Sequence, residues 1–361
     1  MKVLHCINSP HIGGIERLVI ELAIAQKKQG IEVSIMLDSR KGQYYEYLLN
    51  QDIPLLDSGI KGGFDFNFRT YKNLQRQFQH FDLLHLHSFS SIRSLAVKAS
   101  KIKTIYTIHG LSKGIRKENG LKIFARETFK KHLLNKVDVL VANSQYTLSL
   151  AKEHYGLLKV KSLIILNGIK LPGNTIEHNE TNSVFTIGLV SRFTSRKRID
   201  RLVNAFEQYK LKNGQGKLVL VGDGTTFAAI KKQVSHSKYL KDIRLTGYKE
   251  NVQDYYKKFD VLVFPSEAEP FGLVGVEAYI HGKPVLAFSD SGGLKEVIKP
   301  LEPENIVDNE EQLANRMLFY EQHQNMVMDK AKDRINYAKI NFSIKRMERN
   351  YYDIYKTLMV I

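Results

Sequence analysis

Residues 261–277 read Val-Leu-Val-Phe-Pro-Ser-Glu-Ala-Glu-Pro-Phe-Gly-Leu-Val-Gly-Val-Glu, and they are the most informative segment for the fold class. Its apolar, β-branched start predicts a buried strand that ends at Pro265. Phe271-Gly272-Leu273 then begins a helix, whose first N–H groups have no intrahelical partner. A strand, a loop and a helix in this order form the repeating unit of parallel sheets that helices cover on both faces.

The same unit recurs on both sides of this stretch. Near the start of the chain, Lys2–Asn8 predicts a strand, residues 9–14 a turn, and the apolar spacing from Ile15 to Ala23 a helix. The other expected strands are Glu32–Met36, Leu83–Leu86, Thr104–Ile108, Val137–Ala142, Ser162–Leu166, Phe185–Val190, Lys217–Val221, Ile243–Leu245, Val261–Phe264 and Val285–Phe288. The other expected helices are Ile199–Tyr209, Thr225–Val234 and Leu273–His281, and the chain is helical from about Asn309 onward.

A polar segment divides the chain into two parts. Residues 171–183 have little apolar content and several turn-forming residues, as linkers do. We therefore expect an α/β protein with two Rossmann-like, doubly wound parallel-sheet domains that face a cleft, over residues 1–172 and 183–340. We expect residues 341–361 to form a helix that packs back on the first domain.

Composition places the protein among ordinary globular chains. It has 361 residues, of which 43% are hydrophobic and 25% charged, so two cores of comparable size are expected. Its single cysteine, Cys6, lies in an apolar run, where we expect a buried side chain without a disulfide. No run of about 18 apolar residues predicts a membrane span, and we expect a cytoplasmic protein.

Positive charge is concentrated in the first half. Residues 1–170 hold 26 Lys and Arg against 13 Asp and Glu, whereas residues 171–361 hold 28 against 24. Within the first half, Lys101–Lys136 contains ten basic residues and two acids. Such a segment favours an anionic partner.

Two loops in the second half carry residues suited to a nucleoside diphosphate. Glu277 lies one turn into its helix, where a carboxylate can bind the two hydroxyls of a ribose. The loop after Phe185–Val190 has four cations within seven residues, which could hold a diphosphate through charge-assisted hydrogen bonds. From spacing alone, a solvated basic loop explains these cations equally well.

Gly13-Gly14 gives a weaker signal. Glycine before a helix lets a phosphate approach the backbone N–H groups, although such a pair is more often a tight turn. It is neither a complete G-x-G-x-x-G nor a Walker loop, which disfavours a dinucleotide-dependent dehydrogenase and an NTPase.

Taken in order, these features resemble the retaining GT-B glycosyltransferases of glycosyltransferase family 4, the group 1 glycosyltransferases. Glu269 and Glu277, with Pro-Phe-Gly between them, resemble the family signature, and Arg192 with Lys197 resembles its arginine–lysine pair. The resemblance runs from about residue 3 to 298. Shorter matches in the same order are Gly13-Gly14 with Glu16, His109-Gly110, Asn143-Ser144, Asn167-Gly168, Gly222-Asp223-Gly224 and Gly292-Gly293.

The resemblance implies a role for each matched residue. Arg192 and Lys197 would hold the donor diphosphate, Glu277 the ribose and Glu269 the donor sugar, while His109 would line the sugar site from the first domain. His109, Arg192, Lys197 and Glu269 are therefore the expected catalytic residues. The other expected donor-binding residues are Gly13, Gly14, Gly222, Asp223, Phe271, Gly272, Leu273 and Val274. One departure stands out, because Arg198 occupies a position where the family usually has glycine.

The chemistry agrees with this resemblance. A departing nucleoside diphosphate leaves negative charge, which fixed cations and a helix N-terminus stabilise. We find no Asp-x-Asp motif and no His/Cys ligand spacing, so we expect no metal or other cofactor. A nucleotide-diphosphate sugar, UDP-linked rather than GDP-linked, is the expected co-substrate, with a hexose or N-acetylhexosamine transferred.

The basic segment suggests where the acceptor binds. Residues 115–136 mix apolar residues with cations, which predicts an amphipathic helix on an anionic membrane and a glycan or lipid-linked acceptor at its cytoplasmic face. An ordinary solvated helix is the alternative. The residues expected on the acceptor or membrane side are Lys113, Arg116, Lys117, Lys122, Arg126, Lys130 and Lys131.

The sequence disfavours three other functions. A nucleotide-sugar 2-epimerase shares the two-domain shape but would lack the Glu269 to Glu277 pattern. A catalytically inactive relative that binds nucleotide sugars is disfavoured by the presence of both glutamates and the arginine–lysine pair. A nucleic-acid-binding module is disfavoured because the cations are not interleaved with stacking aromatic residues.

Overall fold

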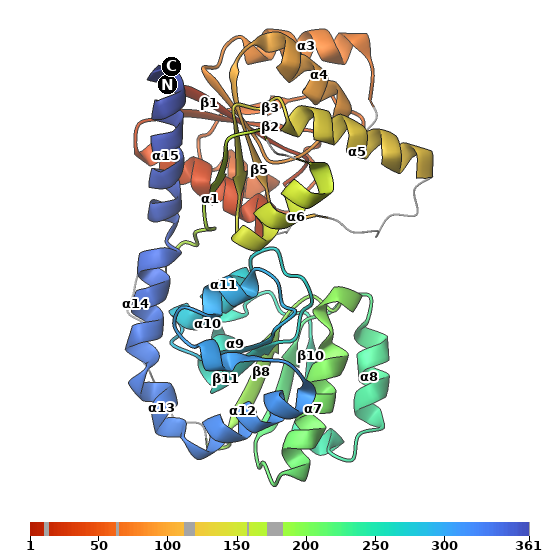
Figure 1. Ribbon diagram of the computed structural model, residues 1–361, viewed down its shortest axis with the longest axis vertical. Coiled ribbons are helices and arrows are strands. Elements are labelled where there is room, and N and C mark those ends of the chain that lie inside the picture. Colours follow the sequence, from red (N-terminus) through yellow and green to blue (C-terminus); the bar gives the residue numbers. More distant parts are fainter. Residues whose placement is uncertain (11–13, 63–64, 112–119, 157–158, 172–182, 361) are drawn as a thin grey trace. The chain divides into compact units, whose positions relative to one another are not determined.

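The computed structural model describes residues 1–10, 14–62, 65–111, 120–156, 159–171 and 183–360, with only the backbone of Leu121 and Lys122. The chain divides into two compact units (Figure 1). Unit 1 consists of Met1–Lys170 and Ser343–Ile361, and unit 2 consists of Leu171–Phe342. The expected linker lies almost entirely outside the described residues.

Unit 1 contains a parallel sheet of seven strands in the order β3-β2-β1-β4-β5-β6-β7. The strands are β1 (Lys2–Ile7), β2 (Glu32–Leu37), β3 (Leu55–Asp57), β4 (Leu83–Leu86), β5 (Lys103–Ile108), β6 (Val139–Ala142) and β7 (Ser162–Ile164). The helices are α1 (Gly14–Lys28), α2 (Tyr45–Leu49), α3 (Phe68–Phe78), α4 (Ser91–Ser100), α5 (Gly120–Leu134), α6 (Gln145–Tyr155) and α15 (Ile344–Val360).

Unit 2 contains a parallel sheet of six strands in the order β10-β9-β8-β11-β12-β13. The strands are β8 (Thr186–Val190), β9 (Lys217–Val221), β10 (Ile243–Gly247), β11 (Val261–Phe264), β12 (Val285–Phe288) and β13 (Ile306–Val307). The helices are α7 (Ile199–Leu211), α8 (Phe227–Ser235), α9 (Gln253–Lys258), α10 (Leu273–Ile280), α11 (Leu294–Ile298), α12 (Glu310–Gln322), α13 (Gln324–Asp329) and α14 (Ala331–Asn341).

Both sheets place their first strand third and their fourth strand beside it, which is the Rossmann-like order. The predicted α/β class with two doubly wound sheets is therefore confirmed. The predicted strands are present with small differences at their ends. The prediction missed β3 and β13 because they are short edge strands, and it gave no bounds for α2, α3, α4, α6, α9 and α11.

Alternation of side chains along the strands of unit 1 builds a core on each face. Val3 and Ile7 of β1 pack in the cluster that contains α1 and α15, whereas Leu4 and Cys6 pack in the cluster that contains α3, α4 and α6. Cys6 is fully buried, as expected. The helix α15 lies beside α1 (Figure 1), whereas the helices that precede it, α12–α14, belong to unit 2.

None of the described helices is both long and apolar enough to cross a membrane.

Candidate active site

Unit 2 brings together the two loops that the sequence singled out. The loop after β8 contains a short 3-10 helix, Ser195–Lys197, and the loop after β11 contains Glu269. The backbone N–H of Glu267 donates to the carbonyl oxygen of Arg196 at 2.9 Å. The ammonium of Lys197 forms an ion pair with the carboxylate of Glu269, and the two side chains are only 17% and 9% exposed. Two residues that are 72 positions apart thus form one charged centre.

The loop after β8 also explains the departure at Arg198. This residue has φ 46° and ψ 42°, the left-handed conformation that glycine adopts most readily. Its guanidinium lies 3.3 Å from Asp200 and 3.7 Å from Glu267, and the hydrogen bond to Asp200 raises the pKa of Arg198. The additional charge is therefore paired locally. Arg192, at the start of the loop, is exposed.

The start of α10 is shaped by Gly272. This residue has φ 92°, and a Cβ there would lie 2.7 Å from a methyl carbon of Leu294, so a larger residue would be both strained and obstructed. Phe271 is buried, and its ring packs edge to face against that of Phe342, with 5.8 Å between the ring centres. The expected diphosphate ligands, the N–H groups of Leu273 and Val274, belong to the first turn of α10, where intrahelical partners are lacking.

Glu277 has a partner that the sequence did not reveal. The hydroxyl of Tyr256 in α9 donates to its Oε2 at 2.9 Å. Tyr256 is fully buried, its pKa is raised by burial and by the charge of Glu277, and its ring stacks on His281 at 5.0 Å. A tyrosine on a short, unpredicted helix gave no signal in the sequence. Its hydroxyl orients one carboxylate oxygen of Glu277.

Gly222 and Asp223 contact the backbone of the loop after β8. A Cβ on Gly222 would lie 1.8 Å from the carbonyl oxygen of Ser191, and the N–H of Phe193 donates to the carbonyl of Asp223 at 2.9 Å. The exposed carboxylate of Asp223 accepts from the N–H of Gly224 at 2.6 Å. These contacts place the two residues beside the loop that carries Arg192 and Lys197.

In unit 1, His109 lies at the end of β5 and lines a pocket of about 190 Å³. Its imidazole is buried, and burial lowers its pKa to about 4. The side-chain amide of Asn143 donates to its carbonyl oxygen at 3.3 Å. Glu16 and Lys130 line the same pocket. Gly14 begins α1, and Gly13 lies outside the described residues.

The expected acceptor-side cations do not share one environment. Lys131 is exposed on α5, whereas Arg126 lies 3.3 Å from Glu127. Lys130 is mostly buried, its ammonium lies 5.2 Å from the ring centre of Tyr155, and burial lowers its pKa. Lys130 therefore faces the pocket of His109 instead of an open surface. Lys113, Arg116 and Lys117 lie outside the described residues, as does the side chain of Lys122.

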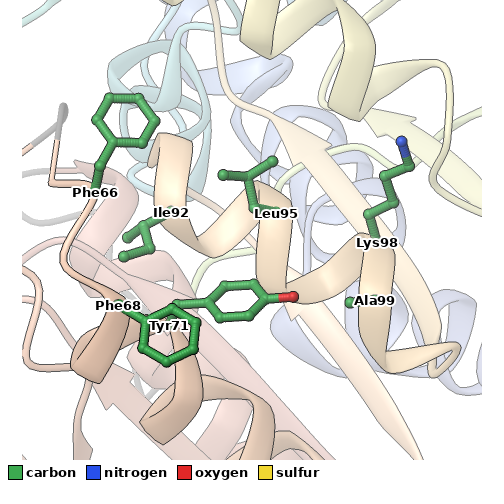
Figure 2. Close-up of a pocket in the computed structure, with 7 residues that line it drawn as sticks. All are labelled: Phe66, Phe68, Tyr71, Ile92, Leu95, Lys98 and Ala99. Atoms are coloured by element: carbon green, nitrogen blue, oxygen red, sulfur yellow. The ribbon is translucent and has the colours of Figure 1, made fainter.

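Unit 1 also has an open apolar pocket of about 490 Å³ between α3 and α4 (Figure 2). Phe68 is 68% exposed and Phe66 is 54% exposed, which is unusual for aromatic side chains. Neither α3 nor α4 contains an acidic residue. The lining residues are Phe66, Phe68, Tyr71, Ile92, Leu95, Lys98 and Ala99.

Comparisons with known proteins cover both units. Residues 174–340 match the family model described as glycosyl transferases group 1, and residues 12–171 match the model described as glycosyltransferase family 4. An uncharacterised glycosyltransferase of Methanocaldococcus jannaschii is 29% identical over 306 residues, which cover 82% of this chain and 81% of the relative. A capsular polysaccharide biosynthesis glycosyltransferase of Staphylococcus aureus is 26% identical over 216 residues, 54% of each chain.

Among solved structures, Anabaena HepE in complex with UDP is similar with a TM-score of 0.80 and 19% identity. The likeness covers 99% of this chain and 100% of HepE. The likeness shows that this chain shares its fold with HepE.

Proposed function

The chain belongs to glycosyltransferase family 4 and has its GT-B fold, and on this premise we propose that it is a retaining, metal-independent transferase of a hexose or N-acetylhexosamine. The donor is a nucleotide-diphosphate sugar, with UDP favoured over GDP. The acceptor is a hydroxyl of a glycan or of a lipid-linked sugar in the assembly of a cell-surface polysaccharide or lipopolysaccharide.

The ion pair between Lys197 and Glu269 carries this proposal. It joins the expected diphosphate loop to the expected sugar loop at the carboxyl ends of neighbouring strands, where open α/β sheets bind ligands. An ammonium has three donors, so Lys197 can hold Glu269 and a phosphate oxygen together. Arg192 and the N-terminus of α10 supply further positive potential for the departing diphosphate.

These groups account for the reaction without a metal. The acceptor oxygen forms a bond to the anomeric carbon while the bond from that carbon to the diphosphate breaks on the same face, so the configuration is retained. The acceptor proton passes to a phosphate oxygen of the leaving group. The positive charges stabilise the diphosphate as its charge develops, which is where such groups contribute most to the rate.

Unit 1 supports a membrane-associated acceptor. Its basic excess favours an anionic surface, and the apolar pocket between α3 and α4 lies between helices without acidic residues. The relative in S. aureus is named for capsular polysaccharide biosynthesis, which supports an acceptor of this class. These observations support the proposal that the enzyme acts at the cytoplasmic face of the membrane.

A donor screen tests the proposal. The purified protein is mixed with UDP- and GDP-sugars, with and without a chelator, and thermal shift and release of nucleoside diphosphate are measured. We expect one UDP-sugar to stabilise the protein and to be turned over in the presence of chelator. Glu277→Ala, which removes the ribose ligand, and Arg192→Ala, which removes a diphosphate ligand, should abolish both effects.

The same screen separates the alternatives. Formation of an epimerised nucleotide sugar without acceptor would identify a 2-epimerase. Binding without turnover in the presence of varied glycan and lipid-linked acceptors would favour an inactive relative. No response to any nucleotide sugar would contradict the transferase assignment.

A further inference from the structure

Four histidines lie together inside unit 1, on the face of the sheet that α1 and α15 cover. His5 of β1 and His85 of β4 are lateral neighbours in the sheet. Because side chains alternate along a strand, His87 follows two residues later on the same face. Thr107 and His109, from β5, continue the row. The strand register therefore assembles the cluster from residues that are far apart in the sequence.

Hydrogen bonds join three of these rings, those of His5, His87 and His109, in a continuous path. Nε2 of His109 lies 3.0 Å from Nδ1 of His87, and Nε2 of His87 lies 2.9 Å from Nδ1 of His5. Nε2 of His5 lies 2.7 Å from Oε1 of Gln26 in α1. The amide nitrogen of Gln26 donates to the hydroxyl of Tyr355 in α15 at 3.1 Å. This path, from Tyr355 to His109, is called the histidine relay below.

The relay is better explained by hydrogen bonding than by a metal. In the part of the chain that the structure describes, His5, His85 and His87 form a group whose ligand atoms lie within 4.8 Å of one another. Each ring nitrogen of the three already has a partner, since His85 contacts the hydroxyls of Tyr355 at 2.6 Å and Thr107 at 2.8 Å. A metal would have to displace these partners.

All four rings are neutral near pH 7. Burial lowers the pKa of His5 and of His109 to about 4, and it lowers the pKa of His85 and His87 well below the usual value. A neutral imidazole has one N–H donor and one acceptor nitrogen. If one nitrogen of a ring in the relay donates, the other must accept. The direction of one hydrogen bond therefore fixes the direction of the next.

The carbonyl oxygen of Gln26 sets this direction. It can only accept, so Nε2 of His5 donates to it and Nδ1 of His5 must accept. His87 then donates from Nε2 and accepts at Nδ1, which requires His109 to donate from Nε2. The remaining nitrogen, Nδ1 of His109, then carries a lone pair; it is buried and has no hydrogen-bond partner among the residues that the structure describes. This nitrogen is an acceptor, and His109 lines the pocket of about 190 Å³ in unit 1.

Helix α15 contacts the amide of Gln26 and joins it to His85. The hydroxyl of Tyr355 accepts from the amide nitrogen of Gln26, which leaves its own proton free for Nδ1 of His85. His85 then donates to Thr107, whose hydroxyl lies 3.0 Å from that of Tyr351. Each of these bonds can take the direction that the relay requires, because a hydroxyl can both donate and accept.

We propose that Gln26, His5 and His87 are positioning residues that hold His109 in the tautomer with Nε2 protonated, so that its Nδ1 accepts a hydrogen bond from a hydroxyl of the donor sugar. This inference rests on the proposed function, because it assumes that His109 faces a sugar. It makes the tautomer of His109 depend on α15, at the far end of the chain. A sugar that lacks the corresponding hydroxyl binds more weakly.

The tautomer can be measured without enzymatic activity. Protein labelled with 15N in histidine is studied by NMR, which distinguishes protonated from unprotonated ring nitrogens, and His109→Gln identifies the signals of His109. We expect protonated Nε2 and unprotonated Nδ1 in the wild type. In Gln26→Met, where no amide selects the direction, we expect both tautomers. A wild-type His109 protonated at Nδ1, or an unchanged tautomer in Gln26→Met, overturns the relay.

Two substitutions on α15 form a matched pair. Tyr355→Phe and Tyr351→Phe each remove one buried hydroxyl, but only Tyr355 contacts Gln26. We expect mixed tautomers of His109 in Tyr355→Phe and the wild-type tautomer in Tyr351→Phe. Equal spectra of the two variants contradict the proposed role of Tyr355. Tyr351→Phe removes the hydrogen bond to Thr107, whereas Tyr355→Phe removes those to Gln26 and His85, so the unfolding free energies of both variants are measured beside the spectra.

Binding measurements separate this proposal from the proposed function. UDP lacks the sugar that is transferred, so Gln26→Met should bind UDP as the wild type does and should bind the UDP-sugar from the donor screen about two- to tenfold more weakly, according to the fraction of His109 that remains in the competent tautomer. Equal affinity of both proteins for the UDP-sugar contradicts the sugar contact. Absence of UDP binding in the wild type contradicts the proposed function, while the NMR result still decides the relay.

Discussion

The charged pair of Lys197 and Glu269 has two roles that substitutions can separate. Both side chains are largely shielded from water, so each lowers the desolvation cost of the other. In the proposed reaction, the same ammonium also binds the diphosphate. Removing one partner therefore affects both stability and donor binding, whereas removing both should affect only binding.

We expect Lys197→Met to destabilise the protein by about 1–3 kcal/mol, because Glu269 then remains almost buried without a cation. The double variant Lys197→Met/Glu269→Gln should recover most of this stability but none of the donor turnover. Denaturant unfolding and release of nucleoside diphosphate measure the two effects.

A surface pair provides the control for this prediction. Lys212 and Glu311 lie 3.3 Å apart with 35% and 68% exposure, so Lys212→Met should change stability by less than about 1 kcal/mol. Recovery of turnover in the double variant would contradict the role of Lys197 in diphosphate binding.

At the scale of single elements, α3 and α4 combine apolar exposure with positive charge. The pocket between them is lined by exposed aromatic residues, and Lys72 lies 5.5 Å from the ring centre of Phe68. Aromatic rings and flanking cations are typical of surfaces that enter the interface of an anionic membrane. This surface was not predicted, because the sequence drew attention to residues 115–136 instead.

We expect Phe66→Ser/Phe68→Ser to lower binding to vesicles that contain anionic phospholipid by at least about tenfold, since each buried methylene contributes about 0.8 kcal/mol. Sedimentation with anionic and with neutral vesicles, at low and high salt, measures the effect.

Leu211→Ser is the matched control, because Leu211 is 71% exposed but belongs to unit 2. Its binding to vesicles should equal that of the wild type. If the double phenylalanine variant bound as tightly as this control, the pocket between α3 and α4 would have no role at the membrane.

At the scale of the whole molecule, the two units should respond differently to acid. His5 and His109 have folded-state pKa values of about 4, below the usual 6.5, because burial disfavours their charged form. Between these values the unfolded chain binds protons that the folded chain does not bind. Their contribution to stability is therefore complete above about pH 6.5 and decreases as the pH falls toward 4.

We expect the thermal transition of unit 1 to move to lower temperature more steeply than that of unit 2 between pH 7 and pH 5. For each buried histidine, the free energy of unfolding falls by up to about 1.4 kcal/mol per pH unit as the pH decreases between its unfolded and folded pKa values. Calorimetry measures both transitions, and the one that UDP raises is assigned to unit 2. Parallel shifts of the two transitions would contradict this prediction.

The fold class and the family follow from the amino-acid sequence alone. Strand and helix periodicity are local properties, and so are glycine positions and the spacing of Arg192, Lys197, Glu269 and Glu277. Local spacing was sufficient to recognise two doubly wound sheets. It also identified Arg198 as a departure, although only the backbone conformation explained why glycine is favoured there.

The contacts between side chains from distant parts of the chain depend on the tertiary structure. The partner of Glu277 is Tyr256, from another helix, and the ion pair joins loops after two different strands. The histidine relay depends on the register of β1, β4 and β5 and on a helix from the end of the chain. Hydrogen bonds between distant segments follow from packing in three dimensions, and no periodicity along the chain encodes them.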